Sequence, residues 1–156
     1  MSRKRILLVD DDPVTHLIVL KMVSVLSLSW DVKTCSHPAQ VFSFFSDEKW
    51  RPDLAIIDHY MPDLEGPALI QLLCQHGEPL TWVGISSSVQ HNLWKQEHAA
   101  EAYFTKPITP DMLQICDTLA QFARVRQTQN QEFASDLKSN PSNVPLLMSN
   151  QMPLRG

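Results

Sequence analysis

The feature that most constrains the fold is a regular alternation of short apolar runs with longer segments of helical periodicity. The apolar runs are of strand length and predict five strands, at residues 5–9, 30–35, 53–57, 81–85 and 102–105. The segments between and after them predict helices whose apolar faces hold Val14, Ile18, Met22 and Val25; Val41, Phe44 and Phe45; Leu69, Leu72 and Leu73; and Met112, Ile115, Leu119 and Phe122. Residues 90–99 form a shorter, more polar helical segment.

This alternation predicts an α/β fold. Strands that each feed a helix need right-handed crossover connections, so the strands are parallel and the helices cover both faces of a doubly wound sheet. In such sheets the ligand site lies outside the carboxyl ends of the strands.

The chain divides by composition into a domain at residues 1–126 and a tail at residues 127–156. Gln, Asn, Ser and Pro supply 15 of the last 30 residues, and the charges of that segment cancel. A composition this polar predicts a disordered tail or linker.

Charge and hydropathy exclude several classes of protein. Asp and Glu number 17 against 13 Lys and Arg, giving a net charge of -4. This balance argues against sequence-independent binding to nucleic acid, and we expect no direct nucleic-acid contact. Asp10, Asp11 and Asp12 interrupt the first apolar run, and no window has the ~20 apolar residues needed to span a bilayer. A cytoplasmic location without membrane insertion is therefore expected.

Polar side chains follow four of the predicted strands at the point where each ends. Asp10 and Asp11 follow the first strand, Asp58 the third, Ser86 the fourth and Lys106 the fifth. Converging carboxylates repel one another unless a cation binds, and oxygen ligands of this kind suit Mg²⁺. A carboxylate can also attack phosphorus, while an ammonium and a hydroxyl stabilise the transferring group. The set predicts Mg²⁺-dependent phosphoryl transfer to an aspartate.

The motifs around these residues resemble the receiver domain of two-component response regulators. They are Ile-Leu-Leu-Val-Asp-Asp-Asp-Pro at 6–13, Pro-Asp-Leu-Ala-Ile-Ile-Asp at 52–58, Met-Pro at 61–62, Gly66, Val-Gly-Ile-Ser at 83–86 and Lys-Pro at 106–107. The resemblance covers residues 4 to about 125. It implies a flavodoxin-like sheet of five parallel strands in the order 2-1-3-4-5.

The resemblance also assigns a role to each matching residue. Asp58 matches the phosphoryl acceptor, and Ser86 and Lys106 match the groups that bind the phosphoryl oxygens. The Mg²⁺ ligands would be Asp10, Asp11, Asp58 and the backbone carbonyl of Tyr60. Ser86 and Tyr103 match the switch pair that moves on activation. The bond between Lys106 and Pro107 is expected to be cis.

A function follows from this resemblance. The chain would take a phosphoryl group from a histidine kinase or a histidine phosphotransfer protein and change a surface that binds a downstream protein. Its only catalysis would be its own phosphorylation and dephosphorylation, so it would be a signalling switch rather than an enzyme. A phosphorylation-dependent dimer is left open. One departure from the family pattern is Asp63, which stands where glycine is usual.

Two other functions are compatible with parts of the sequence. Asp10 to Val14 also fits the first motif of haloacid dehalogenase-type phosphatases, with Asp10 as nucleophile and Asp12 as general acid. The acidic pair this needs after Lys106 would be Asp111 and Asp117, which fall on a predicted helix. A pseudo-receiver that binds partners without phosphorylation is the remaining alternative, although every matched position is chemically competent.

Overall fold

A computed structural model describes residues 2–47, 49–76, 80–88 and 100–143. The chain divides into a unit at residues 1–123 and a second unit at residues 124–156. The helical segment predicted at residues 90–99 lies outside the described residues.

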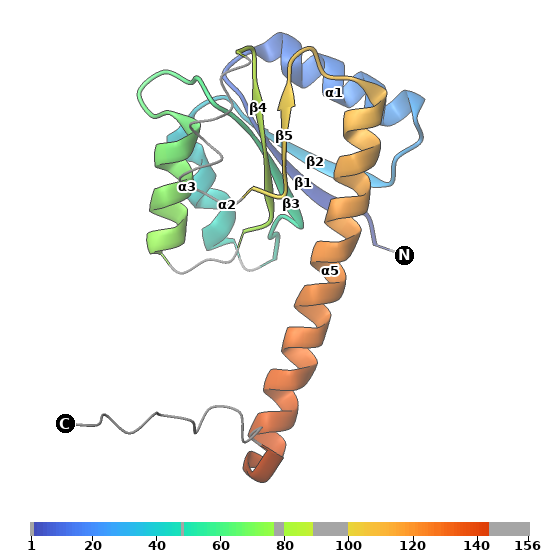
Figure 1. Cartoon of the computed structure of the whole chain (residues 1–156), viewed down its shortest axis with the longest axis vertical. Coiled ribbons are helices and arrows are strands. Elements are labelled where there is room, and N and C mark those ends of the chain that lie inside the picture. Colours follow the sequence, from blue (N-terminus) through green and yellow to red (C-terminus); the bar gives the residue numbers. More distant parts are fainter. Residues whose placement is uncertain (1, 48, 77–79, 89–99, 144–156) are drawn as a thin grey trace, which may run out of the picture. The chain divides into compact units, whose positions relative to one another are not determined.

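The first unit is built on one parallel sheet of the predicted topology. Its strands are β1 (Lys4–Val9), β2 (Trp30–Cys35), β3 (Leu54–Asp58), β4 (Trp82–Ser86) and β5 (Ala102–Thr105). Their order is β2-β1-β3-β4-β5, and all neighbours run parallel, which confirms the predicted fold class (Figure 1).

The register of the sheet brings the strand ends to one edge. Val9 lies beside both Cys35 and Ile57, the residue before Asp58. Asp58 lies beside Ile85, and Ser86 lies beside Thr105, the residue before Lys106. Because parallel strands all end on the same side, the polar residues that follow them share the carboxyl edge.

Helices cover both faces of the sheet. They are α1 (Pro13–Val25), α2 (Val41–Ser46), which follows a 3₁₀ turn at Pro38–Gln40, α3 (Gly66–Gln75) and α5 (Pro110–Ser139). Figure 1 shows α2 and α3 on one face, with α1 and the start of α5 on the other. Two buried clusters match this layering, one around Leu7, Ile57 and Leu69, the other around Leu8, Ile56 and Leu113.

The residues predicted to face the core are wrong for two helices. In each helix the buried face lies about one residue along from the predicted face. In α1 the buried residues are Thr15 and Val19, whereas Val14 and Val25 are exposed. The helix is apolar on several sides, so periodicity alone did not fix which side packs.

In α5 the buried residues are Leu113, Cys116, Ala120 and Ala123. Ile115 and Phe122, which the periodicity placed inside, are exposed. Small side chains let the helix backbone approach the sheet closely, and they are easily overlooked when large apolar residues define the pattern.

The tail was predicted to be irregular from residue 127, but α5 continues to Ser139 and a 3₁₀ turn follows at Pro141–Asn143. Residues 127–139 contain no proline or glycine, so nothing in their backbone opposes the helix. Residues 144–156 lie outside the described part of the chain. No helix among the described residues is long and apolar enough to span a membrane.

One polar contact joins α5 to the amino ends of β1 and β2. Asp117 Oδ1 accepts hydrogen bonds from Lys4 Nζ at 2.7 Å and from Trp30 Nε1 at 2.6 Å. Trp30 is buried, with 4% of its surface exposed, so its indole N–H depends on this carboxylate. A buried donor without an acceptor is destabilising.

We expect Asp117→Ala to lower the free energy of unfolding by about 1–3 kcal/mol, because the indole N–H of Trp30 loses its acceptor. Urea unfolding measures the change. Gln121→Ala, an exposed substitution in the same helix, is the matched control. Equal stability of Asp117→Ala and the control would contradict the structural role of this contact.

Candidate functional site

Three carboxylates converge at the carboxyl edge of the sheet. One oxygen from each of Asp10, Asp11 and Asp58 lies within 4.8 Å of the others. Asp10 is 0% exposed and Asp58 is 4% exposed, whereas Asp11 reaches solvent. The structure therefore brings together the acidic residues that the sequence predicted would meet.

Local backbone bonds hold Asp10 and assign Asp12 a different role. The N–H of Asp10 donates to the carbonyl of Cys35 at 3.0 Å, and Asp10 Oδ1 accepts from the N–H of Asp12 at 2.8 Å. Asp12 caps α1 by accepting from the N–H of Val14 at 2.9 Å, with Pro13 as the first helical residue. Its carboxylate satisfies the helix end.

Lys106 supplies the positive charge of the site. Its Nζ lies 2.7 Å from Asp10 Oδ2 and 3.5 Å from Asp58 Oδ1. Burial alone would lower the pKa of this ammonium, but the hydrogen bond to Asp10 and the charges of both carboxylates outweigh it and raise the pKa. The peptide bond to Pro107 is cis, as expected.

Asp58 is held in a state that favours its protonated form. Burial, reinforced by the charge of Asp10, raises the pKa of Asp58 from 3.8 to about 6, although Lys106 acts in the opposite direction. One ammonium does not offset desolvation plus neighbouring carboxylates. The site therefore has a deficit of positive charge that a cation would relieve.

Ser86 lies between Asp58 and Lys106 along the edge. It ends β4 and is 3% exposed, and the N–H of Lys106 donates to its carbonyl at 2.8 Å. The Ser86 hydroxyl accepts from the N–H of Ser88 at 3.1 Å. Ser86 thus sits at the strand end that was expected, in the neighbouring strand to Asp58.

The two tyrosines lie in different environments. Tyr60 follows Asp58 by two residues in the loop after β3, and its half-exposed ring stacks on His59 at 4.3 Å between centroids. Tyr103 lies in β5, its hydroxyl accepts from the N–H of Ala100 at 3.3 Å, and its ring meets Trp82 edge-on at 5.9 Å. The roles of the Tyr60 carbonyl and of the Tyr103 ring stay predictions.

A contact that the sequence did not predict joins the loops after β2 and β3. His37 Nε2 lies 3.0 Å from Asp63 Oδ2, and His37 Nδ1 accepts from the N–H of Ala39 at 3.2 Å. That second bond makes Nε2 the protonated nitrogen of the neutral ring. Asp63 has a φ of 69°, the left-handed region that favours glycine.

The donor set fits Mg²⁺. This ion takes oxygen ligands, accepts one or two carboxylates from the protein and keeps several waters. Asp10, Asp11 and Asp58 offer only oxygens, and Asp11 faces solvent, which leaves room for water. The raised pKa of Asp58 is a second sign that the cluster suits a cation.

The arrangement does not supply the acidic pair of a haloacid dehalogenase-type phosphatase. Asp111 lies in the first turn of α5, and Asp117 is bonded to Lys4 and Trp30 at the amino ends of the strands. Asp117 therefore lies at the edge of the sheet opposite to Asp10 and Lys106, so the two acidic residues of the pair do not meet at the site.

Comparison with known proteins agrees with the fold and with this site. The family model of the response regulator receiver domain matches residues 6–116. The chain belongs to the response regulator receiver domain family.

The chain is also similar to curated relatives and to solved structures. Two-component response regulator ORR21 of Oryza sativa subsp. indica is 30% identical over 110 residues, which is 70% of this chain and 16% of that protein. The match thus spans a small part of that relative's length. The signal receiver domain of an HD domain-containing protein from Pseudomonas fluorescens Pf-5 has a TM-score of 0.71 at 19% identity, covering 82% of this chain and 94% of the other.

A further similar structure is response regulator protein TrrA of Thermotoga maritima, solved in complex with Mg(2+)-BeF. Its TM-score is 0.62 at 22% identity, covering 75% of this chain and 98% of the other. At such identities the likeness establishes the shared fold.

Without metal, Asp58→Asn should stabilise the protein at neutral pH. The folded-state pKa of Asp58 is about 6 against 3.8 for the ordinary group, so the native state of the wild type binds more protons between these values and loses stability as the pH rises through them. We expect a gain of about 3 kcal/mol at pH 7.5 and only about 0.5 kcal/mol at pH 4. Urea unfolding in EDTA measures both values, and a gain that does not depend on pH would contradict the raised pKa.

The left-handed backbone at Asp63 should favour glycine over alanine. We expect Asp63→Gly to be more stable than Asp63→Ala by about 1 kcal/mol, because a Cβ is unfavourable at this φ. Both variants lose the contact with His37, so each serves as the other's control, and thermal unfolding measures the difference. Equal stability of the two would show that the residue is not left-handed in solution.

Proposed function

We propose that the chain accepts a phosphoryl group on Asp58 and acts as a phosphorylation-controlled switch. The observation that carries this proposal is the convergence of Asp10, Asp11 and Asp58 with Lys106 at one sheet edge. A buried carboxylate beside an ammonium and further acidic ligands has the groups needed for phosphoryl transfer to aspartate.

The donor would be a phosphohistidine of a histidine kinase or phosphotransfer protein. An oxygen of ionised Asp58 attacks phosphorus, a P–O bond forms, and the P–N bond to the imidazole breaks with its electron pair going to that nitrogen. The raised pKa of Asp58 favours protonation of the nucleophile when no cation is bound. Protonation of Asp58 and binding of Mg²⁺ therefore compete, so the Mg²⁺ concentration needed for phosphorylation should rise as the pH falls below about 6.

Each neighbouring residue would then have a defined role in phosphoryl transfer. Lys106, which lies 3.5 Å from Asp58 Oδ1, would bind a phosphoryl oxygen, and the Ser86 hydroxyl would bind another. Asp10, Asp11, Asp58 and the Tyr60 carbonyl would hold Mg²⁺. When bound, Mg²⁺ supplies positive charge that offsets the repulsion between the carboxylates and the incoming phosphoryl oxygens.

Phosphorylation of Asp58 would alter the surface of the domain through changes in β4 and β5. The new charge on Asp58 draws Ser86 and Lys106 toward it, and both residues are joined by the backbone bond between Lys106 N–H and the Ser86 carbonyl. Tyr103 lies in the strand that ends before Lys106 and packs on Trp82, so a shift there changes the aromatic packing. A downstream protein would recognise the altered surface, with dimerisation as the alternative output.

We expect acetyl phosphate with Mg²⁺ to add one phosphoryl group to the wild type and none to Asp58→Asn. Asp10 is buried in the same cluster, but one of its oxygens contacts Lys106 and the other accepts from the N–H of Asp12, so it is not expected to replace Asp58 as the acceptor. Intact-protein mass spectrometry measures the addition. EDTA should abolish labelling of the wild type.

Asp12→Asn is the matched control, since Asp12 is adjacent to the cluster but caps α1. It should be labelled like the wild type. Unchanged labelling of Asp58→Asn would refute the acceptor assignment. A folded wild type without label would favour a phosphorylation-independent interaction module.

A further inference from the structure

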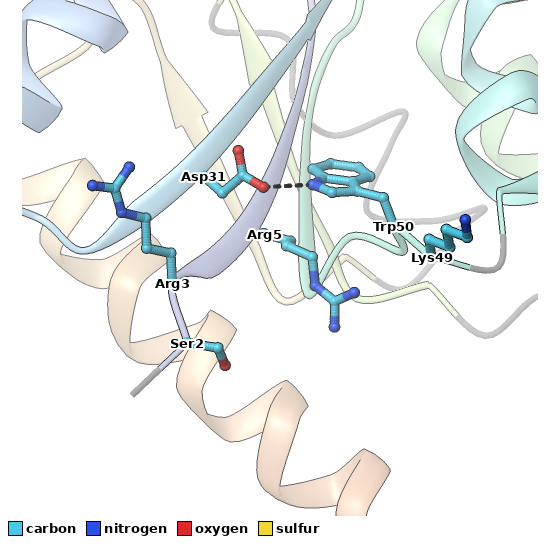
Figure 2. Close-up of a pocket in the computed structure, with 6 residues that line it drawn as sticks. All are labelled: Ser2, Arg3, Arg5, Asp31, Lys49 and Trp50. Atoms are coloured by element: carbon cyan, nitrogen blue, oxygen red, sulfur yellow. Dashed lines mark hydrogen bonds between the residues drawn. The ribbon is translucent and has the colours of Figure 1, made fainter.

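A basic pocket lies at the opposite, amino edge of the sheet, remote in the fold from the strand ends that carry Asp58. It has a volume of about 590 Å³ and is lined by Ser2, Arg3, Arg5, Asp31, Lys49 and Trp50 (Figure 2). This volume falls in the range of small-molecule sites. Three of the lining residues are cationic and one is acidic, although the chain as a whole has a net charge of -4.

The single carboxylate of the pocket is already engaged. Asp31 Oδ2 accepts a hydrogen bond from Trp50 Nε1 at 2.7 Å. Figure 2 shows this bonded pair in the centre of the pocket, with Arg3 and Lys49 to either side and Arg5 below. The bond orients the carboxylate toward the indole but leaves its negative charge in place. The excess of positive charge comes from the three cationic lining residues against this one carboxylate.

The aromatic wall of the pocket is rigidly held. Trp50 is only 7% exposed, its ring lies 4.4 Å from Lys33 Nζ and packs against Phe44 at 5.7 Å between centroids. The indole is thus fixed by an N–H bond on its edge, a cation on its face and a neighbouring ring. A wall that does not rearrange lowers the entropic cost of binding.

Arg5 and Lys49 supply the groups for an anion. Arg5 lies in β1 and its backbone N–H donates to Asp53 Oδ2 at 2.6 Å, which fixes the point from which its side chain extends. Lys49 precedes Trp50 and is exposed. Within the described parts of the chain, no ion pair is formed by the side chain of either residue. Guanidinium and ammonium groups together are suited to phosphate oxygens.

We propose that this pocket binds a compact phosphate-type polyanion, such as pyrophosphate or the phosphate chain of a nucleotide, through Arg5 and Lys49 with Arg3 at its rim. The limited volume of this open pocket and its few cations favour a compact ligand over an extended nucleic acid, which would need a longer basic footprint. The site is separate from Asp58, so the inference does not rest on the proposed phosphorylation.

The experiment titrates the full chain with pyrophosphate at low ionic strength and in EDTA, so that no metal ion carries pyrophosphate to the acidic cluster. The probe is the indole N–H signal of Trp50 in a ¹H–¹⁵N NMR spectrum, assigned by its loss in Trp50→Phe. We expect a saturable shift, and a Kd weakened about fivefold or more in Arg5→Gln and in Lys49→Gln. Added salt should also weaken binding.

Lys21→Gln is the matched control, since Lys21 is an exposed cation on α1 and does not line this pocket. It should keep the wild-type Kd. Lys49→Gln alters an exposed side chain, so it carries the test if Arg5→Gln fails to fold.

A shift that stays linear in pyrophosphate concentration would overturn the proposal, as would equal losses in Lys21→Gln and Lys49→Gln. A glutamate-rich peptide that saturates the signal at lower concentration than pyrophosphate would replace the polyanion by an acidic protein segment. Unchanged pyrophosphate binding in Asp58→Asn would confirm that the pocket acts apart from the acidic cluster.

Discussion

The structure depends on the burial of negative charge at the carboxyl edge of a parallel sheet. Asp10 and Asp58 are removed from water, and Lys106 is the ammonium that contacts both. Desolvation and mutual repulsion exceed the stabilisation from that one cation, since the pKa of Asp58 stays at about 6. A carboxylate kept in this state is unfavourable for folding and favourable for binding a cation and a phosphoryl group.

Most of the fold and the site could be predicted from the sequence because both follow from strand order and strand ends. A parallel sheet needs buried apolar runs, and the residue after each run must be at the carboxyl edge, so Asp10, Asp58, Ser86 and Lys106 had to meet. Which side of a helix packs against the sheet is harder to predict from the sequence. In α5 the close approach is made by Cys116 and Ala120, which a search for large apolar residues does not weigh.

Contacts between loops were not predictable either. The pair of His37 and Asp63 depends on where two loops converge after folding, and the only signal was that Asp63 stands where the family pattern has glycine. The helical continuation to Ser139 shows a different limit, because a polar composition indicates solvent exposure and does not exclude a helix. Tertiary packing decides the contact between His37 and Asp63, and the continuity of the helical backbone decides where α5 ends.

The two sites at opposite ends of the sheet differ in the sign of their excess charge. Carboxylates gather at the carboxyl edge, whereas Arg3, Arg5 and Lys49 line the pocket at the amino edge. The first edge is suited to a cation and a phosphoryl group, and the second to a compact polyanion. The strands that join these edges are the buried core of the domain, with Leu7 and Ile57 fully enclosed.

We propose that occupancy of Asp58 by a phosphoryl group changes the packing of β4 and β5. The most direct test is a ¹H–¹⁵N NMR comparison of the protein in Mg²⁺ with and without a fluoride–beryllium analogue of the phosphoryl group. We expect shifts at His59, beside the acceptor, together with shifts of the Trp82 indole and the Tyr103 backbone in the wild type, and none of these in Asp58→Asn. Shifts at His59 without any at Trp82 or Tyr103 would contradict the claim, as would the same shifts in Asp58→Asn.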